Sequence, residues 1–131
     1  MLSPQESQSL LEAATSVLNQ AYAIYSGFRV GAAVLTQSGN TYVGCNVENA
    51  SYGLTFCAER AAIAAAVVGE GPQLRLVGIA IANERGATCP PCGACRQTIV
   101  EFGPQAWVIY RGKAGTEQRQ AQELLPEPFL L

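Results

Sequence analysis

Helical and strand patterns alternate along this chain, and this alternation constrains the fold more than any other feature of the sequence. A helix start is predicted at Ser3-Pro4-Gln5-Glu6, which combines an N-cap serine, a first-turn proline and a capping-box glutamate. The expected elements are a helix from residue 3 to about residue 21, hairpin strands over 29–36 and 41–47, a helix over 57–68, a strand over 74–82, a helix over 92–102 and a strand over 106–110.

This order of elements predicts an α/β fold in which helices cover both faces of a mixed sheet, an α/β/α sandwich. Residues 116–121 are compatible with either a strand or a helix. The length of 131 residues and the hydrophobic content of 49% suit one globular domain over residues 1–131.

The charge balance limits the kinds of partner that this chain can bind. With 8 basic and 10 acidic residues, the formal net charge is −2, which does not suit a protein that grips nucleic acid or an anionic membrane. The N-terminus is polar, and the longest apolar run, residues 61–68, is too short to span a bilayer. We therefore expect a cytoplasmic protein with a small-molecule partner.

Residues 61–68, with the sequence AAIAAAVV, are apolar on every side of the expected helix. A helix of this kind is normally buried all round. It would form either the central core of its own domain or the core of an oligomer.

Cysteine and histidine usage restricts the chemistry. The chain has five cysteines, three of them at positions 89, 92 and 95, and no histidine. This pattern suits metal or redox chemistry better than a secreted disulfide framework. The lack of histidine excludes Ser/His and Cys/His nucleophile pairs and imidazole-dependent zinc sites. A transition metal would therefore be held by thiolates, alone or with a carboxylate.

Three of these cysteines have the spacing of a metal site. Cys92 and Cys95 at a helix start would lie on one face, although a redox pair, a structural zinc half-site or two buried core cysteines also fit CxxC. Cys57 lies one βαβ length upstream, so two helices would begin at the same sheet edge. Helix N-termini stabilise thiolates, and three ligands leave a fourth tetrahedral position open for water.

Charged residues flank the predicted cluster. Glu59 and Cys57 converge only if Cys57 occupies the helix end, where Glu59 would accept a proton from metal-bound water. Taken alone, Glu59 is better explained as an acidic residue that is favourable in a first helical turn. Arg60 and Arg96 are candidates to donate hydrogen bonds to the sulfurs.

The segments CAER (57–60) and PCGACRQ (91–97) resemble the cytidine deaminase family in its small-subunit, three-cysteine form. YSGFRVGAA (25–33), GCNVENASYG (44–53) and ELLPEPF (123–129) are also similar to blocks of that family, in the same order. Cys89 and Pro90 depart from the family pattern. The resemblance implies a three-layer α/β/α sandwich with a five-stranded mixed sheet, and hydrolytic deamination of cytidine and 2′-deoxycytidine in pyrimidine salvage.

The resemblance also assigns roles to individual residues. It implies one Zn²⁺ per subunit and proton transfer by Glu59. It further implies a homotetramer whose active sites are shared between subunits. The implied zinc ligands are Cys57, Cys92 and Cys95; the implied substrate contacts are Phe28, Asn46, Glu48 and Ala58, with Ala50, Tyr52 and Phe129 from neighbouring subunits; and the implied supports of the zinc site are Arg60 and Gln97. Asn46 and Glu48 also point to one face of the expected strand.

Two alternatives compete with this interpretation. Cys89, Cys92 and Cys95 resemble part of a ferredoxin run and would suit a metal-binding module without catalysis, but Ile99 stands where that pattern needs a fourth cysteine. The second alternative is a related deaminase that acts on tRNA adenosine, a nucleotide or an aminopyrimidine nucleoside antibiotic. The acidic net charge disfavours binding of tRNA, and Glu48 disfavours a substrate with a phosphate, whereas an antibiotic substrate stays an open alternative.

Overall fold

The computed structural model describes residues 1–131 and contains one five-stranded sheet with the strand order β2-β1-β3-β4-β5. Only β3 and β4 run parallel; the other neighbours are antiparallel. The elements are α1 (Pro4–Val17), η1 (Leu18–Gln20), β1 (Val30–Thr36), β2 (Thr41–Cys45), η2 (Tyr52–Leu54), α2 (Ala58–Glu70), η3 (Gly71–Gln73), β3 (Leu76–Asn83), α3 (Gly93–Phe102), β4 (Trp107–Gly112), β5 (Gly115–Gln120) and α4 (Ala121–Leu124).

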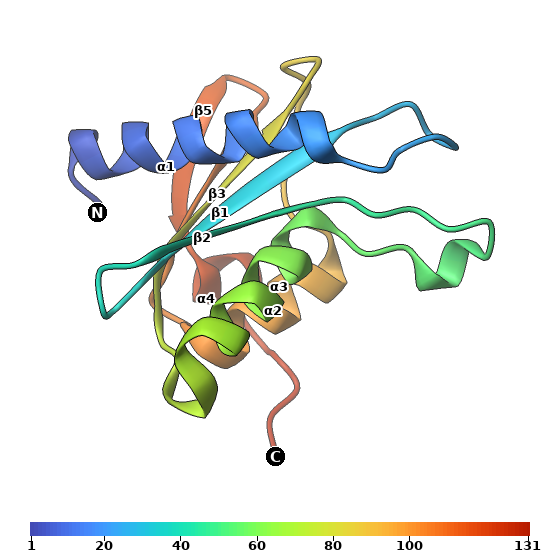
Figure 1. Cartoon of the computed structure of the whole chain (residues 1–131). Helices are drawn as coiled ribbons and strands as arrows, with labels where there is room; N and C mark the ends of the chain where they lie inside the picture. Colours follow the sequence, from blue (N-terminus) through green and yellow to red (C-terminus); the bar gives the residue numbers. More distant parts are fainter.

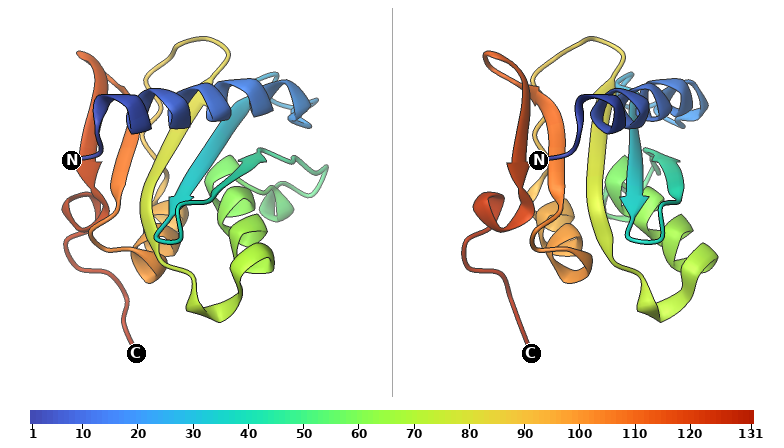
Figure 2. Two further views of the ribbon diagram at one scale, coloured as in Figure 1. Left: turned by 60° about the vertical axis from the view of Figure 1, so that its left-hand side comes forward. Right: turned by 90° about the vertical axis from the view of Figure 1, so that its left-hand side faces the viewer.

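The sheet lies between two helical layers, with α1 on one face and α2 and α3 on the other (Figures 1 and 2). Successive strand residues alternate between the layers, because side chains of a strand point to opposite faces. Ile79 and Val108 join the core beneath α2 and α3, whereas their neighbours Ala80 and Ile109 join the core beneath α1. The predicted three-layer α/β/α sandwich with a five-stranded mixed sheet is therefore confirmed.

The first helix begins where its capping residues predict. The Ser3 hydroxyl accepts a hydrogen bond from the Glu6 amide at 3.1 Å, and the Glu6 carboxylate accepts one from the Ser3 amide at 2.9 Å. These two contacts satisfy amides that have no partner within the helix. The capping box thereby stabilises the first turn of α1.

A glycine sets how closely α2 approaches the sheet. A Cβ added at Gly44 in β2 would lie 2.3 Å from the Ala62 amide nitrogen and 2.7 Å from the Ala58 carbonyl oxygen. Because backbone atoms cannot move aside as a flexible side chain can, only glycine permits this approach. The close packing places the first turn of α2, which carries Glu59, directly against the end of β2.

The structure decides the expectations for residues 116–121 and residues 61–68. Of the ambiguous residues 116–121, residues 116–120 belong to β5, which pairs with β4 over its whole length, and Ala121 begins α4. The expectation that residues 61–68 are buried on every side is wrong for the single chain: Ala64 is exposed and Val68 is 88% exposed. The core of one domain therefore covers only part of this helix. None of the helices is both long and apolar enough to cross a membrane.

Candidate metal centre and substrate pocket

Three cysteines converge where α2 and α3 begin. Cys57 and Cys92 are the N-cap residues of the two helices, in extended backbone conformation, and Cys95 lies in the first turn of α3. Their three Sγ atoms all lie within 4.8 Å of one another. Cys95 is fully buried, whereas Cys92 is exposed. The structure thus brings together all three of the cysteines that the sequence predicts as ligands.

The electrostatics of this cluster favour thiolates. A hydrogen bond from the Cys95 thiol lowers the pKa of Cys57 to about 5, and the Arg60 guanidinium adds to this effect. The pKa of Cys95 is raised, because Cys95 donates to the Cys57 sulfur and is buried. Cys57 therefore ionises first, and a bound dication would be needed to compensate three thiolates together.

Arg60 lies where the sequence predicts, and Arg96 does not. The Arg60 Nη2 is 3.6 Å from the Cys57 Sγ and 3.3 Å from the Thr55 carbonyl oxygen. The prediction that Arg96 donates to the sulfurs is wrong, because its Nε donates to the Pro91 carbonyl at 2.7 Å and its Nη1 donates to the Leu124 carbonyl at 3.0 Å. Arg96 instead joins the Pro91 turn to the C-terminal segment.

Glu59 is a buried carboxylate next to the thiolate cluster. Its residue exposure is only 6%, and it has no arginine or lysine ion-pair partner within 4.0 Å. Burial raises the pKa of Glu59, and the negative charge of Cys57 raises it further. Cys57 is the N-cap of α2, and this helix-end position is the one from which Cys57 and Glu59 were expected to converge. A carboxylate in this environment takes up a proton more readily than an exposed one.

The donor set fits a zinc ion. Three sulfur ligands are typical of zinc, and three protein ligands leave the fourth tetrahedral position for water. The two helix N-termini and Arg60 offset the excess negative charge of three thiolates on one dication. A buried carboxylate that can move protons, beside a site of this kind, provides the parts for metal-assisted hydrolysis.

Asn46 and Glu48 follow β2 and reach the same neighbouring segment. Asn46 accepts a hydrogen bond from the Val30 amide at 2.9 Å through Oδ1, and donates one to the Phe28 carbonyl at 2.8 Å through Nδ2. Glu48 accepts from the Tyr25 and Ser26 amides at 2.9 and 3.0 Å, and also from the Ser26 hydroxyl. The Ser26 hydroxyl is the largest cause of the lowered pKa of Glu48. Glu48 is therefore ionised at neutral pH, where its carboxylate accepts hydrogen bonds.

A cavity of about 330 Å³ adjoins Glu48 and is lined by Tyr25, Ser26, Glu48, Tyr52 and Thr55. The rings of Tyr25 and Tyr52 meet edge to face, with centroids 6.1 Å apart. No cysteine of the thiolate cluster lines this cavity. The cavity therefore contains two of the predicted substrate residues, Glu48 and Tyr52, but not the metal centre.

The remaining predicted site residues differ in their surroundings. Ala58 is fully buried at the first position of α2, whereas Ala50 is exposed and Tyr52 and Phe129 are 75% and 71% exposed. The Gln97 amide is paired with the main chain of Phe129, in hydrogen bonds of 2.9 and 3.0 Å. Gln97 thus anchors the C-terminal segment that carries an exposed aromatic ring.

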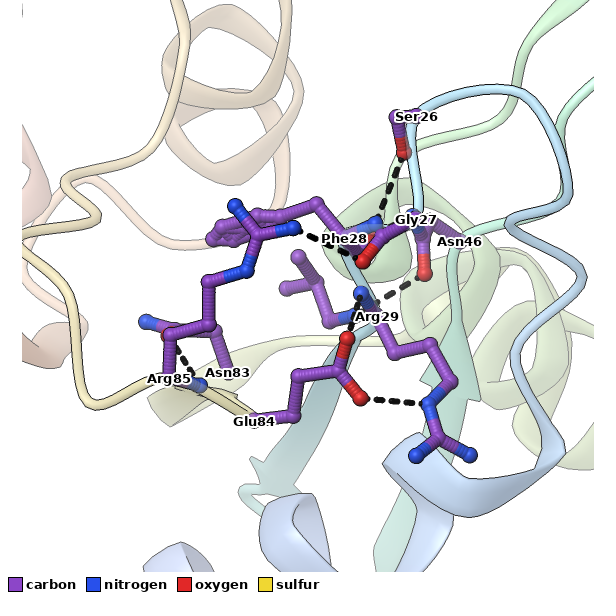
Figure 3. A network of polar contacts seen from close by, with 9 residues as sticks. Ser26, Gly27, Phe28, Arg29, Asn46, Asn83, Glu84 and Arg85 are labelled. Atoms are coloured by element: carbon purple, nitrogen blue, oxygen red, sulfur yellow. Dashed lines mark hydrogen bonds and ion pairs between the residues drawn. The ribbon is translucent and has the colours of Figure 1, made fainter.

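Sequence reasoning missed a group of residues on the loop after β3. Glu84 and Arg85 contact the segment that carries Phe28, as Figure 3 shows. They lie more than fifty positions from their partners, and no local motif marks them.

A mixed sheet that joins a Cys-x-Glu segment and a Pro-Cys-x-x-Cys segment at two helix N-termini defines a zinc-dependent deaminase, a class of hydrolase. Residues 4–111 match the family described as "Cytidine and deoxycytidylate deaminase zinc-binding region", and the chain belongs to this family.

Relatives and solved structures agree with this assignment. The chain is 42% identical over 124 residues to a cytidine deaminase of Halalkalibacterium halodurans, covering 93% of this chain and 92% of the relative. It is 41% identical over 116 residues to a cytidine deaminase of Mycobacterium tuberculosis, covering 88% and 84%. The crystal structure of a cytidine deaminase from Burkholderia pseudomallei superimposes with a TM-score of 0.84 at 42% identity, covering 93% of this chain and 98% of that one.

Proposed function

We propose that residues 1–131 form a single catalytic domain for the hydrolytic deamination of cytidine and 2′-deoxycytidine to uridine and 2′-deoxyuridine plus ammonia. The observation that carries the proposal is the buried Glu59 carboxylate beside three sulfurs that lie within 4.8 Å of one another. The names of the relatives support the choice of substrate. This reaction suits a cytoplasmic enzyme of pyrimidine salvage, because it acts on free nucleosides.

Cys57, Cys92 and Cys95 would hold one zinc ion per chain, which when bound supplies a water activated for attack. Glu59 accepts the proton that this water loses as its oxygen forms a bond to C4 of the pyrimidine. Glu59 then passes that proton to the ring nitrogen N3, and transfers the second proton of the water, from the hydroxyl formed at C4, to the amino group. The C4–N bond breaks and ammonia leaves, so that water is consumed and no oxidant is required. Arg60 and the helix N-termini keep the three sulfurs in their charged form.

The residues after β2 would select an unphosphorylated sugar. Asn46 keeps one amide hydrogen and one lone pair for a ribose hydroxyl after its contacts with Val30 and Phe28. The ionised Glu48 would accept a hydrogen bond from a hydroxyl and would repel a phosphate dianion. Phe28 would pack against the nucleoside, and Ala58 at the start of α2 would adjoin the base.

The exposed apolar residues support a homotetramer. Val68 on α2, Tyr52 and Phe129 leave large apolar surfaces in water, which is typical of surfaces covered by a partner. In such an assembly Ala50, Tyr52 and Phe129 would complete the pocket of a neighbouring copy. Sedimentation equilibrium is expected to give the mass of four chains, and the mass of one chain at micromolar concentration would contradict the assembly.

The substrate is tested by an ultraviolet assay of the purified protein with cytidine, 2′-deoxycytidine, cytosine, CMP and adenosine. Turnover of the two nucleosides is expected, with kcat/KM for CMP and free cytosine at least about 100-fold lower, because a phosphate meets Glu48 and free cytosine lacks the sugar contacts. Equal turnover of cytosine and cytidine would contradict the ribose contacts. Turnover of adenosine alone would contradict the proposed substrate.

The second candidate substrate is an aminopyrimidine nucleoside antibiotic. Glu48 favours it over a nucleotide for the same electrostatic reason. Adding an antibiotic of this class to the assay separates the two candidates, since the preferred substrate has the higher kcat/KM. A thiolate metal module without catalysis would give no turnover of any compound.

A further inference from the structure

The segment of residues 25–30, which carries Phe28, is held from two opposite directions. Asn46 and Glu48 fasten it from the end of β2 by hydrogen bonds to its main chain. Within the segment, the Phe28 amide donates to the Ser26 hydroxyl at 3.0 Å. Both main-chain polar groups of Phe28 therefore have a partner, although residues 25–29 lie outside any helix or strand.

The second direction is the loop that follows β3 (Figure 3). The Arg85 Nη2 donates to the Gly27 carbonyl at 2.9 Å, and the Arg85 guanidinium carbon lies 5.1 Å from the centre of the Phe28 ring. The chain neighbours of these two residues, Arg29 and Glu84, add an ion pair, with the Arg29 Nε 2.6 Å from a Glu84 carboxylate oxygen. One guanidinium thus contacts both the main chain before Phe28 and the Phe28 ring.

The loop that carries Arg85 is itself fixed. The Asn83 Oδ1 accepts hydrogen bonds from the Arg85 and Ala87 amides, both at 3.0 Å, and Asn83 Nδ2 donates to the Ala87 carbonyl at 2.8 Å. Gly86 has a φ of 60°, in the left-handed region that favours glycine. The same connection continues to Cys92. Arg85 therefore joins the Phe28 segment to the connection that delivers one sulfur of the metal centre.

We propose that Arg85 is a positioning residue that fixes the Phe28 ring for nucleoside binding. A guanidinium over an aromatic ring restrains its orientation through the ring quadrupole, and the hydrogen bond to Gly27 restrains the backbone from which the ring projects. Arg85 acts through Phe28 and takes no part in proton transfer at Glu59. The inference rests on the proposed function for its substrate, and on the contacts in Figure 3 for its geometry.

The kinetic test compares Arg85→Ala with the wild type on cytidine. KM is expected to rise about tenfold with kcat within about twofold, from the combined loss of a cation–π contact and a charge-assisted hydrogen bond. Arg85→Lys keeps a cation near the ring and is expected to recover part of the loss. Arg75→Ala removes another exposed arginine that donates to a main-chain carbonyl, and is expected to leave KM unchanged.

A double-mutant cycle shows whether Arg85 acts through Phe28. In a Phe28→Ala background, Arg85→Ala is expected to have no further effect on KM, because the ring that it positions is gone. An equal rise in KM on Arg85→Ala in the wild-type and Phe28→Ala backgrounds would overturn the proposal. A wild-type KM for Arg85→Ala, or a loss confined to kcat, would also overturn it.

Amide hydrogen exchange without substrate gives a readout that does not depend on turnover. Residues 25–30 are expected to exchange faster in Arg85→Ala and at the wild-type rate in Arg75→Ala. Unchanged exchange in Arg85→Ala would overturn the proposed geometry. Absence of cytidine turnover by the wild-type protein would instead contradict the proposed function, and the exchange measurement would still decide the role of Arg85.

Discussion

Glu59→Gln is expected to lower kcat for cytidine by about 10³-fold while the protein still binds zinc and folds, because glutamine keeps the volume of the side chain but cannot accept a proton. Glu59 is buried at the start of α2, and its pKa is raised by that burial. The measurement is the steady-state rate of absorbance loss with saturating cytidine, together with the zinc content of the same sample.

A carboxylate at the other end of the same helix provides the matched control. Glu70 accepts hydrogen bonds from the Thr36 hydroxyl at 2.7 Å and the Asn40 amide at 3.0 Å, in the turn of the hairpin. Glu70→Gln is expected to keep kcat within about twofold, because general acid-base catalysis needs a group at the reacting atoms. Near-normal turnover by Glu59→Gln would remove Glu59 from the mechanism.

Cys95→Ala is expected to lose both zinc and turnover. Cys95 is fully buried, and its Sγ lies within 4.8 Å of the other two sulfurs. Its loss leaves two thiolates, whereas a catalytic zinc site normally has three protein ligands. Zinc content is expected to fall below about one tenth of the wild-type value after dialysis, with kcat reduced at least about 10³-fold. The metal content is measured by atomic emission on the dialysed protein.

Cys89 is the control for this substitution. It is half-buried against the core beneath α2 and α3, does not belong to the group of three sulfurs, and has a pKa raised by burial. Cys89→Ala is expected to retain zinc and turnover, because a protonated thiol outside the cluster supplies no ligand. Equal zinc loss in Cys89→Ala and Cys95→Ala would show that the ligand set is wrong.

Features determined by local pattern could be predicted from the sequence. The start of α1 follows from Ser3 and Glu6, whose side chains form the capping contacts in the structure. The convergence of Cys57, Cys92 and Cys95 also followed, because residue spacing and a βαβ-length connection place two helix starts at one sheet edge.

Features that depend on long-range side-chain geometry could not be predicted in this way. Arg96 and Arg60 both lie near ligands in the sequence, yet only Arg60 contacts a sulfur, since Arg96 reaches the Leu124 carbonyl instead. The contact of Arg85 with Phe28 depends on how two loops meet in space. Residues 61–68 looked uniformly apolar, but the sheet can cover only one side of a helix.

The most direct test of the central claim is a zinc titration of metal-free protein, followed by the rate of cytidine conversion to uridine. We predict no measurable turnover without metal, a linear rise with added zinc, and a plateau at one zinc per chain, because each chain carries one group of three sulfurs beside one Glu59. Full turnover in the metal-free protein, or no cytidine turnover at any zinc concentration, would contradict the account.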